Sequence, residues 1–144
     1  MASSSKPSRT PAPRPTEGEL AILQVLWEHG PLPVRRVQQI LNEIKPTGYT
    51  TVLKLMQIMH EKGLVARDES VRPQIYRARD AQQKTQQRLV RDLVTRAFAG
   101  STRAMVMQAL AAEKSSPEEL EQIERLLERM EQERRNPKTE ETSR

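Results

Sequence analysis

Apolar residues recur every three or four positions along much of this chain, and this spacing predicts amphipathic helices. The clearest stretch runs from Tyr49 to Lys62. One face of a helix there would carry Val52, Leu55, Met56 and Met59. The opposite face would carry Thr50, Lys54, Gln57 and Glu61. The pattern therefore predicts a helix with its apolar side in a core and its polar side in solvent.

A glycine and a short hairpin are predicted to follow this helix. Gly63 can adopt the left-handed backbone conformation that ends a helix. Strand-forming residues then stand on both sides of the turn from Glu69 to Pro73, namely Leu64 and Val65 before it and Ile75 and Tyr76 after it.

Two further helices are predicted before residue 49. Thr16 and Glu19 form the pattern of a capping box, and this first helix should end near Gly30. Its predicted buried residues are Leu20, Leu23, Val25, Leu26 and Trp27. The second helix follows Pro31 and Pro33, with an inner face of Val34, Val37, Ile40, Leu41 and Ile44 and an outer face of Arg35, Arg36, Gln38, Gln39 and Asn42. Helix, turn, helix and hairpin together predict a winged helix-turn-helix.

Three amphipathic helices are predicted after the hairpin. Asp80 is the expected cap of the first, Gly100 its end, and Ser101 and Ser116 the caps of the next two. Such helices, added to a domain of about 65 residues, have too little surface of their own to cover their apolar faces. We expect a homodimer rather than a monomeric bundle, with an interface of Leu89, Leu93, Leu120, Ile123, Leu127 and Met130.

The expected organisation is mainly α-helical, with four parts. A basic tail at 1–15, which is either an arm that tracks DNA or a solubilising leader, precedes a winged-helix domain at 16–79. A helical dimerisation domain at 80–135 and a flexible tail at 136–144 complete the chain.

Composition narrows the classes of function. The chain has 144 residues and no cysteine, which excludes disulfides and thiol catalysis. Its two histidines stand apart and no phosphate-binding glycine loop occurs, so we expect neither an enzyme nor a cofactor or metal site. No segment is apolar enough for a membrane span or a secretory signal, and we expect a cytoplasmic protein. The net charge of +5 favours a polyanionic partner.

Double-stranded DNA fits the polar face of the helix from Tyr49 to Lys62, because its side chains can contact base edges and phosphates in a major groove. The candidate DNA-binding residues are Tyr49, Thr50, Thr51, Lys54, Gln57 and, at the tip of the wing, Arg72. Lys45, Arg67, Arg77 and Arg79 are candidates for supporting contacts. The alternative for each is a solvated surface residue.

Three segments carry a resemblance to a known family: PTEGELAILQVLWEHGPLPVRRV, GYTTVLKLMQIMHEKGLV and the return strand ending in YRA. They resemble the penicillinase-repressor family, and a looser similarity continues to Met130. The resemblance implies a repressor on a palindromic operator that controls antibiotic-resistance or cell-envelope genes. Many members have arginine where this chain has Ile58.

The resemblance also implies a membrane-bound sensor protease as a partner, which cleaves the repressor at an asparagine-phenylalanine bond. The matching residues here are Gln108 and Ala109, and both differ. The alternative to a repressor is a winged-helix module for protein interaction or assembly that does not bind specific DNA sequences. Weak dependence of partner binding on salt would indicate that alternative.

Overall fold

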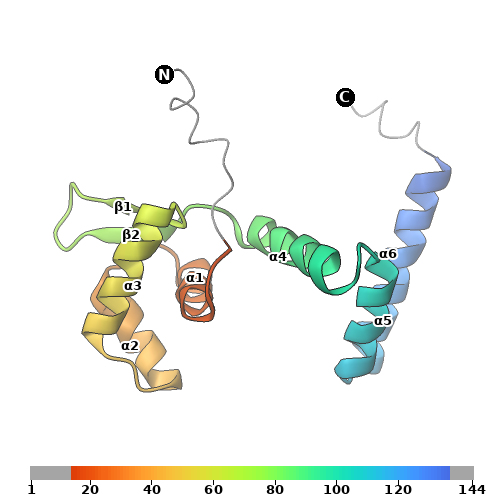
Figure 1. Cartoon of the computed structure of the whole chain (residues 1–144), viewed down its shortest axis with the longest axis horizontal. Coiled ribbons are helices and arrows are strands. Elements are labelled where there is room, and N and C mark those ends of the chain that lie inside the picture. The colour runs from red at the N-terminus through yellow and green to blue at the C-terminus, as the bar shows by residue number, and fades with distance from the viewer. Residues whose placement is uncertain (1–13, 137–144) are drawn as a thin grey trace. The chain divides into compact units, whose positions relative to one another are not determined.

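The computed structural model describes residues 14–136 and forms two compact units, one ending at Asp92 and the other starting at Leu93. Its elements are α1 (Glu17–His29), α2 (Val34–Ile44), α3 (Tyr49–Lys62), β1 (Val65–Asp68), β2 (Ile75–Ala78), α4 (Gln82–Ala97), α5 (Thr102–Ala112) and α6 (Pro117–Arg135) (Figure 1). The predicted winged helix-turn-helix with a helical extension is confirmed. The two predicted tails lie outside the described residues except for Arg14, Pro15 and Asn136.

The predicted capping box starts α1. The backbone N–H of Glu19 donates to the hydroxyl of Thr16 at 3.3 Å, and the N–H of Thr16 donates to the Glu19 carboxylate at 2.9 Å. Gly30 ends the helix with a φ of +82°. These reciprocal bonds satisfy two N–H groups that a helix start leaves without partners.

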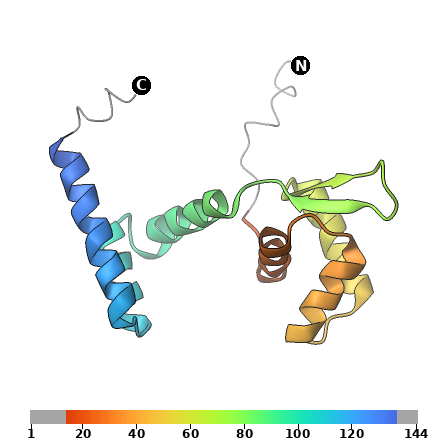
Figure 2. The ribbon, with the colours of Figure 1, turned by 180° about the vertical axis from the view of Figure 1, so that it is seen from behind.

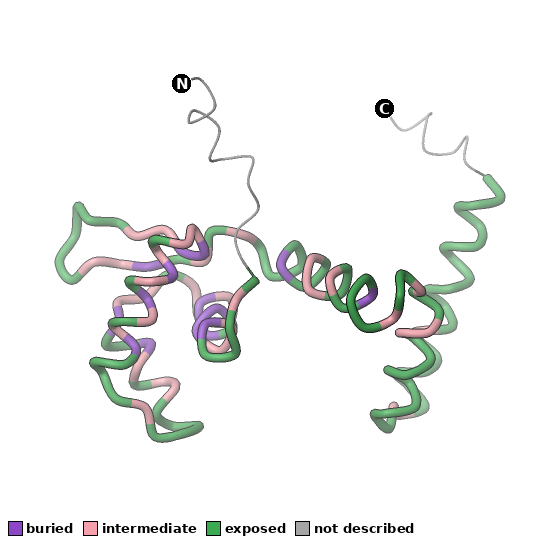
Figure 3. The backbone as a smooth tube through the Cα atoms, viewed as in Figure 1, coloured by how far each residue is buried: buried purple, intermediate pink, exposed green. Residues whose placement is uncertain are grey.

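One apolar core holds α1, α2, α3 and the hairpin together. Its buried residues come from all these elements: Ile22, Leu23, Val25, Leu26, Val34, Val37, Val52, Met56, Met59, Leu64, Val65 and Tyr76 (Figure 3). The prediction was wrong for Ile44, whose exposed fraction is 80%. Ile44 is the last residue of α2, where the chain leaves the helix for the turn. Ile40, Leu41, Leu20 and Trp27 are only half-buried.

The hairpin is antiparallel and extends away from the helices (Figures 1 and 2). Val65 pairs with Ala78 and Asp68 with Ile75. Leu32, in the segment between α1 and α2, exchanges two backbone hydrogen bonds with Tyr76, at 2.9 and 2.8 Å. The wing is therefore attached by its backbone to the start of α2, a contact that the sequence pattern did not predict.

Gly63 ends α3 in the left-handed conformation, with a φ of +80°. Replacement by alanine should lower the free energy of unfolding by about 1 kcal/mol, because a side chain is disfavoured there. The new Cβ would also lie 2.6 Å from Nη1 of Arg79, which must shift. Urea denaturation measures the loss. Gly48→Ala is the matched control, since its φ is −78° and its Cβ would meet nothing within 4 Å. Equal losses in both variants would contradict the conformational explanation.

The start of α4 differs from the prediction. The helix begins at Gln82, and the N–H of Thr85 donates to the carbonyl of Ala81. The carboxylate of Asp80 instead pairs with the guanidinium of Arg88. The carbonyl of Asp80 accepts a hydrogen bond from Nε1 of Trp27 at 3.0 Å. Asp80 therefore joins α4 to the winged-helix core rather than capping the helix.

The C-terminal unit has the predicted helix starts. Ser101 accepts a hydrogen bond from the N–H of Ala104, and Ser116 accepts one from the N–H of Glu119. Neither α5 nor α6 has a buried residue (Figure 3). The apolar residues of α6 are exposed by 42% at Leu120, 46% at Leu126, 58% at Leu127 and 56% at Met130. None of the helices in residues 14–136 has both the length and the apolar content needed to cross a lipid bilayer.

Candidate DNA-binding surface

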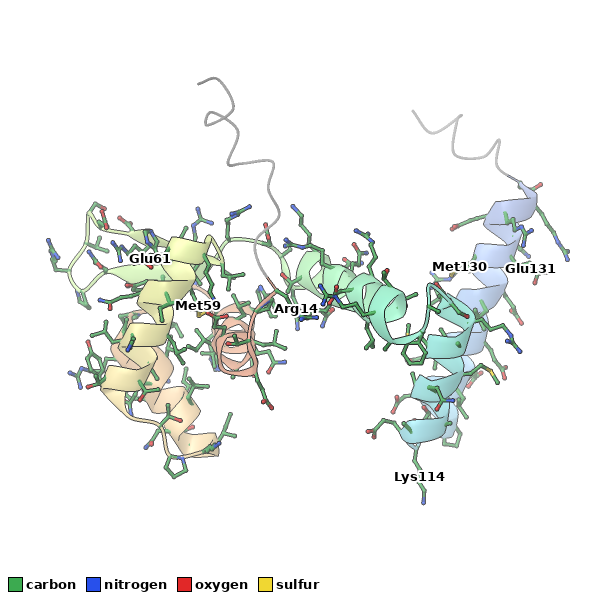
Figure 4. The ribbon with its side chains drawn as sticks, viewed as in Figure 1. Arg14, Met59, Glu61, Lys114, Met130 and Glu131 are labelled. Atoms are coloured by element: carbon green, nitrogen blue, oxygen red, sulfur yellow. The ribbon has the colours of Figure 1, made fainter. Side chains whose placement is uncertain are left out.

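Helix α3 has the two faces that its sequence predicts. Val52, Met56 and Met59 are fully buried. Thr50, Lys54, Gln57 and Glu61 are all exposed. Met59 and Glu61 leave the helix on different sides, with Met59 directed towards α1 (Figure 4). The polar face is therefore free to meet a ligand, as a recognition helix requires.

The turn between α2 and α3 is held by hydrogen bonds to two side chains that the sequence pattern placed on the outer face of α2. Nε2 of Gln38 donates to the carbonyl of Thr47 at 2.9 Å, and Oδ1 of Asn42 accepts from the N–H of Thr47 at 3.0 Å. The Thr47 hydroxyl donates to the carbonyl of Lys45 at 2.7 Å. No side chain caps the start of α3 at Gly48. Its first N–H groups thus retain the capacity to bind an anion.

A hollow lies between α2, α3 and the wing, and we call it the arginine hollow. Its charged lining consists of Arg35, Arg36 and Arg72, without any acid. The rest of the lining is Pro33, Val34, Gln39, Tyr49, Leu53, Gln57, Pro73, Gln74 and Tyr76. The guanidinium carbon of Arg35 lies 4.9 Å from the centre of the Tyr49 ring, within range of a cation–π interaction.

The structure brings only some of the candidate DNA-binding residues together. Tyr49, Gln57 and Arg72 line the arginine hollow. Thr51 lines a different hollow, between α1, the end of α2 and α3. Thr50 and Lys54 are exposed on the face of α3 that is opposite its buried residues. The candidates therefore extend across the exposed face of α3 and continue towards the wing.

The sequence pattern did not single out Arg35 and Arg36 as DNA-binding residues. Both are exposed in the first turn of α2, a turn that contains no acid. Cations are unfavourable beside the positive end of a helix dipole. Two arginines at this position therefore indicate a role other than stabilising the helix, and this indication can be recognised from the sequence alone.

The supporting arginines of the wing differ in availability. Nε of Arg67 donates to Glu69 at 2.8 Å, and hydrogen bonds with Tyr76 and then Glu69 raise the pKa of Arg67. Hydrogen bonds from Ser70 lower the pKa of Asp68. Arg67 is therefore engaged within the hairpin. Arg72 and Arg77 are exposed and have no acid paired with them in the part of the chain that the structure describes.

Helix α3 is fixed to α1 by a buried ion pair. Glu19 is 1% exposed, and its carboxylate oxygens lie 2.9 and 3.1 Å from Nζ of Lys62 at the end of α3. Burial raises the pKa of Glu19, but the hydrogen bond from Thr16 and the ammonium of Lys62 outweigh that effect and hold the pKa below its usual value. Glu19 therefore has two partners, of which the sequence pattern predicted only Thr16.

Two comparisons with known proteins bear on the family of the chain. No match was found among curated proteins. A family model described as penicillinase repressor matches residues 15–129, which include the winged helix and most of the helical extension. In the described chain, no group of three histidine or acidic residues is placed to hold a metal ion. Because the family model matches most of its length, the chain belongs to the penicillinase repressor family, a family of transcriptional regulators.

Proposed function

We propose that this protein is a dimeric transcriptional repressor that occupies a palindromic operator in double-stranded DNA. Membership of the penicillinase repressor family supports DNA binding and repression. The single observation that carries the proposal is the exposed polar face of α3 beside a hollow lined by arginines and no acid. Occupation of a promoter by such a protein blocks transcription, and antibiotic-resistance or cell-envelope genes are the proposed targets.

Each part of this surface has a proposed role. Thr50, Lys54 and Gln57 face the base edges of the major groove, where hydroxyl, ammonium and amide groups can read sequence. Tyr49 and Thr51, at the start of α3, lie at the edge of that groove. Arg72 on the wing contacts the backbone or the adjacent minor groove.

A second copy of the chain is the proposed cover for the exposed apolar residues of the helical extension. The interface would include Leu93, Leu120, Leu127 and Met130, which are exposed, and Leu89 and Ile123, which are half-buried. Two recognition helices related by a two-fold axis would read two half-sites of one operator. Because the second binding event is then intramolecular, affinity rises without any new kind of interaction.

We further propose that a membrane-bound sensor protease controls this repressor. This proposal rests on family resemblance. Gln108 and Ala109, at the corresponding position, are exposed within α5. Since a protease requires an extended substrate, cleavage there would need α5 to open locally. Incubation with the sensor protease, followed by mass spectrometry, tests whether this bond is cut.

Lys54→Ala should weaken binding to the operator about tenfold, because each good contact to a base or phosphate contributes about 1–3 kcal/mol. The operator would first be selected from genomic fragments, and affinity measured across a salt series. Lys114→Ala is the matched control, since Lys114 is an exposed lysine between α5 and α6 (Figure 4). Equal affinities of the two variants would contradict the assigned face. A wild-type affinity that does not change with salt would favour the protein-interaction module instead.

A further inference from the structure

The arginine hollow carries more positive charge than the exposed face of α3, on which Lys54 is accompanied by Glu61. Several cations in and next to the winged helix have an acid partner: Lys62 pairs with Glu19, Arg67 with Glu69, and Arg79 and Arg88 with Asp80. Arg35, Arg36 and Arg72 have no acid paired with them among residues 14–136, and these three arginines line one hollow that contains no acid. The structure thus concentrates uncompensated positive charge on one side of α3.

Two of the three arginines of the hollow contact another of its side chains. Arg35 lies over the ring of Tyr49, and Nη1 of Arg36 donates to Oε1 of Gln39 at 3.3 Å. A guanidinium that stacks through its face keeps its N–H groups, which lie in its plane, for other acceptors. Arginine and phosphate form bidentate, charge-assisted hydrogen bonds. The arrangement therefore suits phosphate oxygens.

The position of the hollow identifies the source of the phosphate. Gln57 belongs both to the exposed face of α3 and to the lining of the hollow. A sugar-phosphate strand that borders the major groove read by α3 would consequently run beside Gln57 and into the hollow. The backbone bridge between Leu32 and Tyr76 holds the wing at the start of α2. Arg72 of the wing would therefore lie on the opposite side of this sugar-phosphate strand from Arg35 and Arg36.

We propose that Arg35 and Arg36 of α2 grip the DNA backbone, with Arg72 opposite them, and that Tyr49 is a positioning residue that orients Arg35 through its ring. This inference rests on the proposed function and adds a second anchoring site to it. It assigns Tyr49 a role through its ring rather than through its hydroxyl. Because interactions with the backbone carry no sequence information, the grip strengthens binding to every duplex alike.

The double variant Arg35→Ala/Arg36→Ala tests the grip in the full-length protein. The slope of log affinity against log salt should fall by about 0.9 for each phosphate that the variant no longer neutralises, hence by about 3.6 for a dimer in which four arginines are replaced. Binding to the operator and to unrelated duplexes should weaken by the same factor. The control is Arg125→Ala/Arg129→Ala, which removes two exposed arginines from α6. Circular dichroism and thermal unfolding establish that both proteins remain folded.

Two variants of Tyr49 test the positioning role. Tyr49→Phe keeps the ring and should bind as the wild type does, whereas Tyr49→Leu should lose nearly as much affinity as Arg35→Ala alone. Combining Tyr49→Leu with Arg35→Ala should add little, because both act on the same guanidinium. A loss in Tyr49→Phe, or full additivity in the combined variant, would overturn this role.

The remaining outcomes separate this inference from the proposed function. Failure of the wild type to bind any duplex would refute the proposed function itself. Wild-type binding with an unchanged salt slope in the double variant would refute only the grip. Saturable binding of inorganic phosphate at constant ionic strength, abolished in the double variant while its DNA affinity stays unchanged, would identify a small-anion site and overturn the inference.

Discussion

Replacing Ile123 and Leu127 of α6 with glutamate is expected to convert the proposed dimer into monomers and to weaken binding to the proposed operator by about 10²- to 10⁴-fold. The apolar seam would then carry four negative charges across a two-fold axis, where desolvating them is costly. The decrease in DNA affinity follows because each monomer binds one half-site without the high effective concentration of its partner. Analytical ultracentrifugation and operator titration measure the two effects.

The same chain offers a close control for this experiment. Gln122→Glu and Gln132→Glu add equal charge to α6, on a polar side shared with Arg125, Glu128 and Arg129. That variant should remain dimeric and bind the operator normally. No residue of α6 is buried within one chain, so the two glutamates do not disrupt the core of a monomer. Loss of the dimer in the Ile123→Glu/Leu127→Glu protein would therefore not result from unfolding. Dimers that persist in the Ile123→Glu/Leu127→Glu protein would place the interface elsewhere.

Replacing Lys62 with methionine is expected to lower the free energy of unfolding by about 3 kcal/mol at pH 7. The change leaves the buried carboxylate of Glu19 without its cation, and breaking one side of a buried pair costs about 3–5 kcal/mol. The hydrogen bond from Thr16 remains, which keeps the cost at the low end. Urea denaturation measures the change. Lys54→Met removes an exposed lysine from the same helix and should alter stability by less than about 0.5 kcal/mol.

The pH dependence of this variant has a definite sign. In the wild type the pKa of Glu19 is lowered by folding, so its contribution to stability is present above the pKa of the unfolded chain and is lost as the pH falls through the folded value. In Lys62→Met, burial without the ammonium should raise that pKa, and protonation then relieves the penalty. The difference in stability between the two proteins should therefore begin to shrink as the pH falls through the raised pKa of the variant, above the unperturbed value of 4.5, and should continue to shrink until the pH has passed the lowered pKa of the wild type. A difference that grows on acidification would contradict the assignment.

Local signals in the sequence predicted those parts of the structure that depend on neighbouring residues. The capping box at Thr16, the serine caps at Ser101 and Ser116, and the two faces of α3 all involve residues within four positions of one another. A helix imposes such spacings directly, since side chains three or four residues apart share a face.

The interactions that escaped prediction join residues far apart in the chain. The ion pair of Glu19 with Lys62 and the bridge of Leu32 with Tyr76 each span more than forty residues, and no periodic pattern encodes them. Ile44 fits the apolar stripe of α2, but its side chain is left in solvent at the end of the helix. The sequence predicts Arg35 and Arg36 only as part of an outer face. Their connection to Tyr49 and Arg72 depends on how α2, α3 and the wing pack together.

The backbone bridge between Leu32 and Tyr76 has a consequence for the thermodynamics of binding. It joins the return strand of the wing to the segment that starts α2, so these two elements, which are proposed to face DNA, share one preorganised frame. Little conformational entropy of the backbone then remains to be given up on association, and the enthalpy of each interaction is retained in the affinity. For the same reason, an operator with altered groove width must itself deform to fit the rigid protein, and the stiffness of the DNA becomes a source of selectivity.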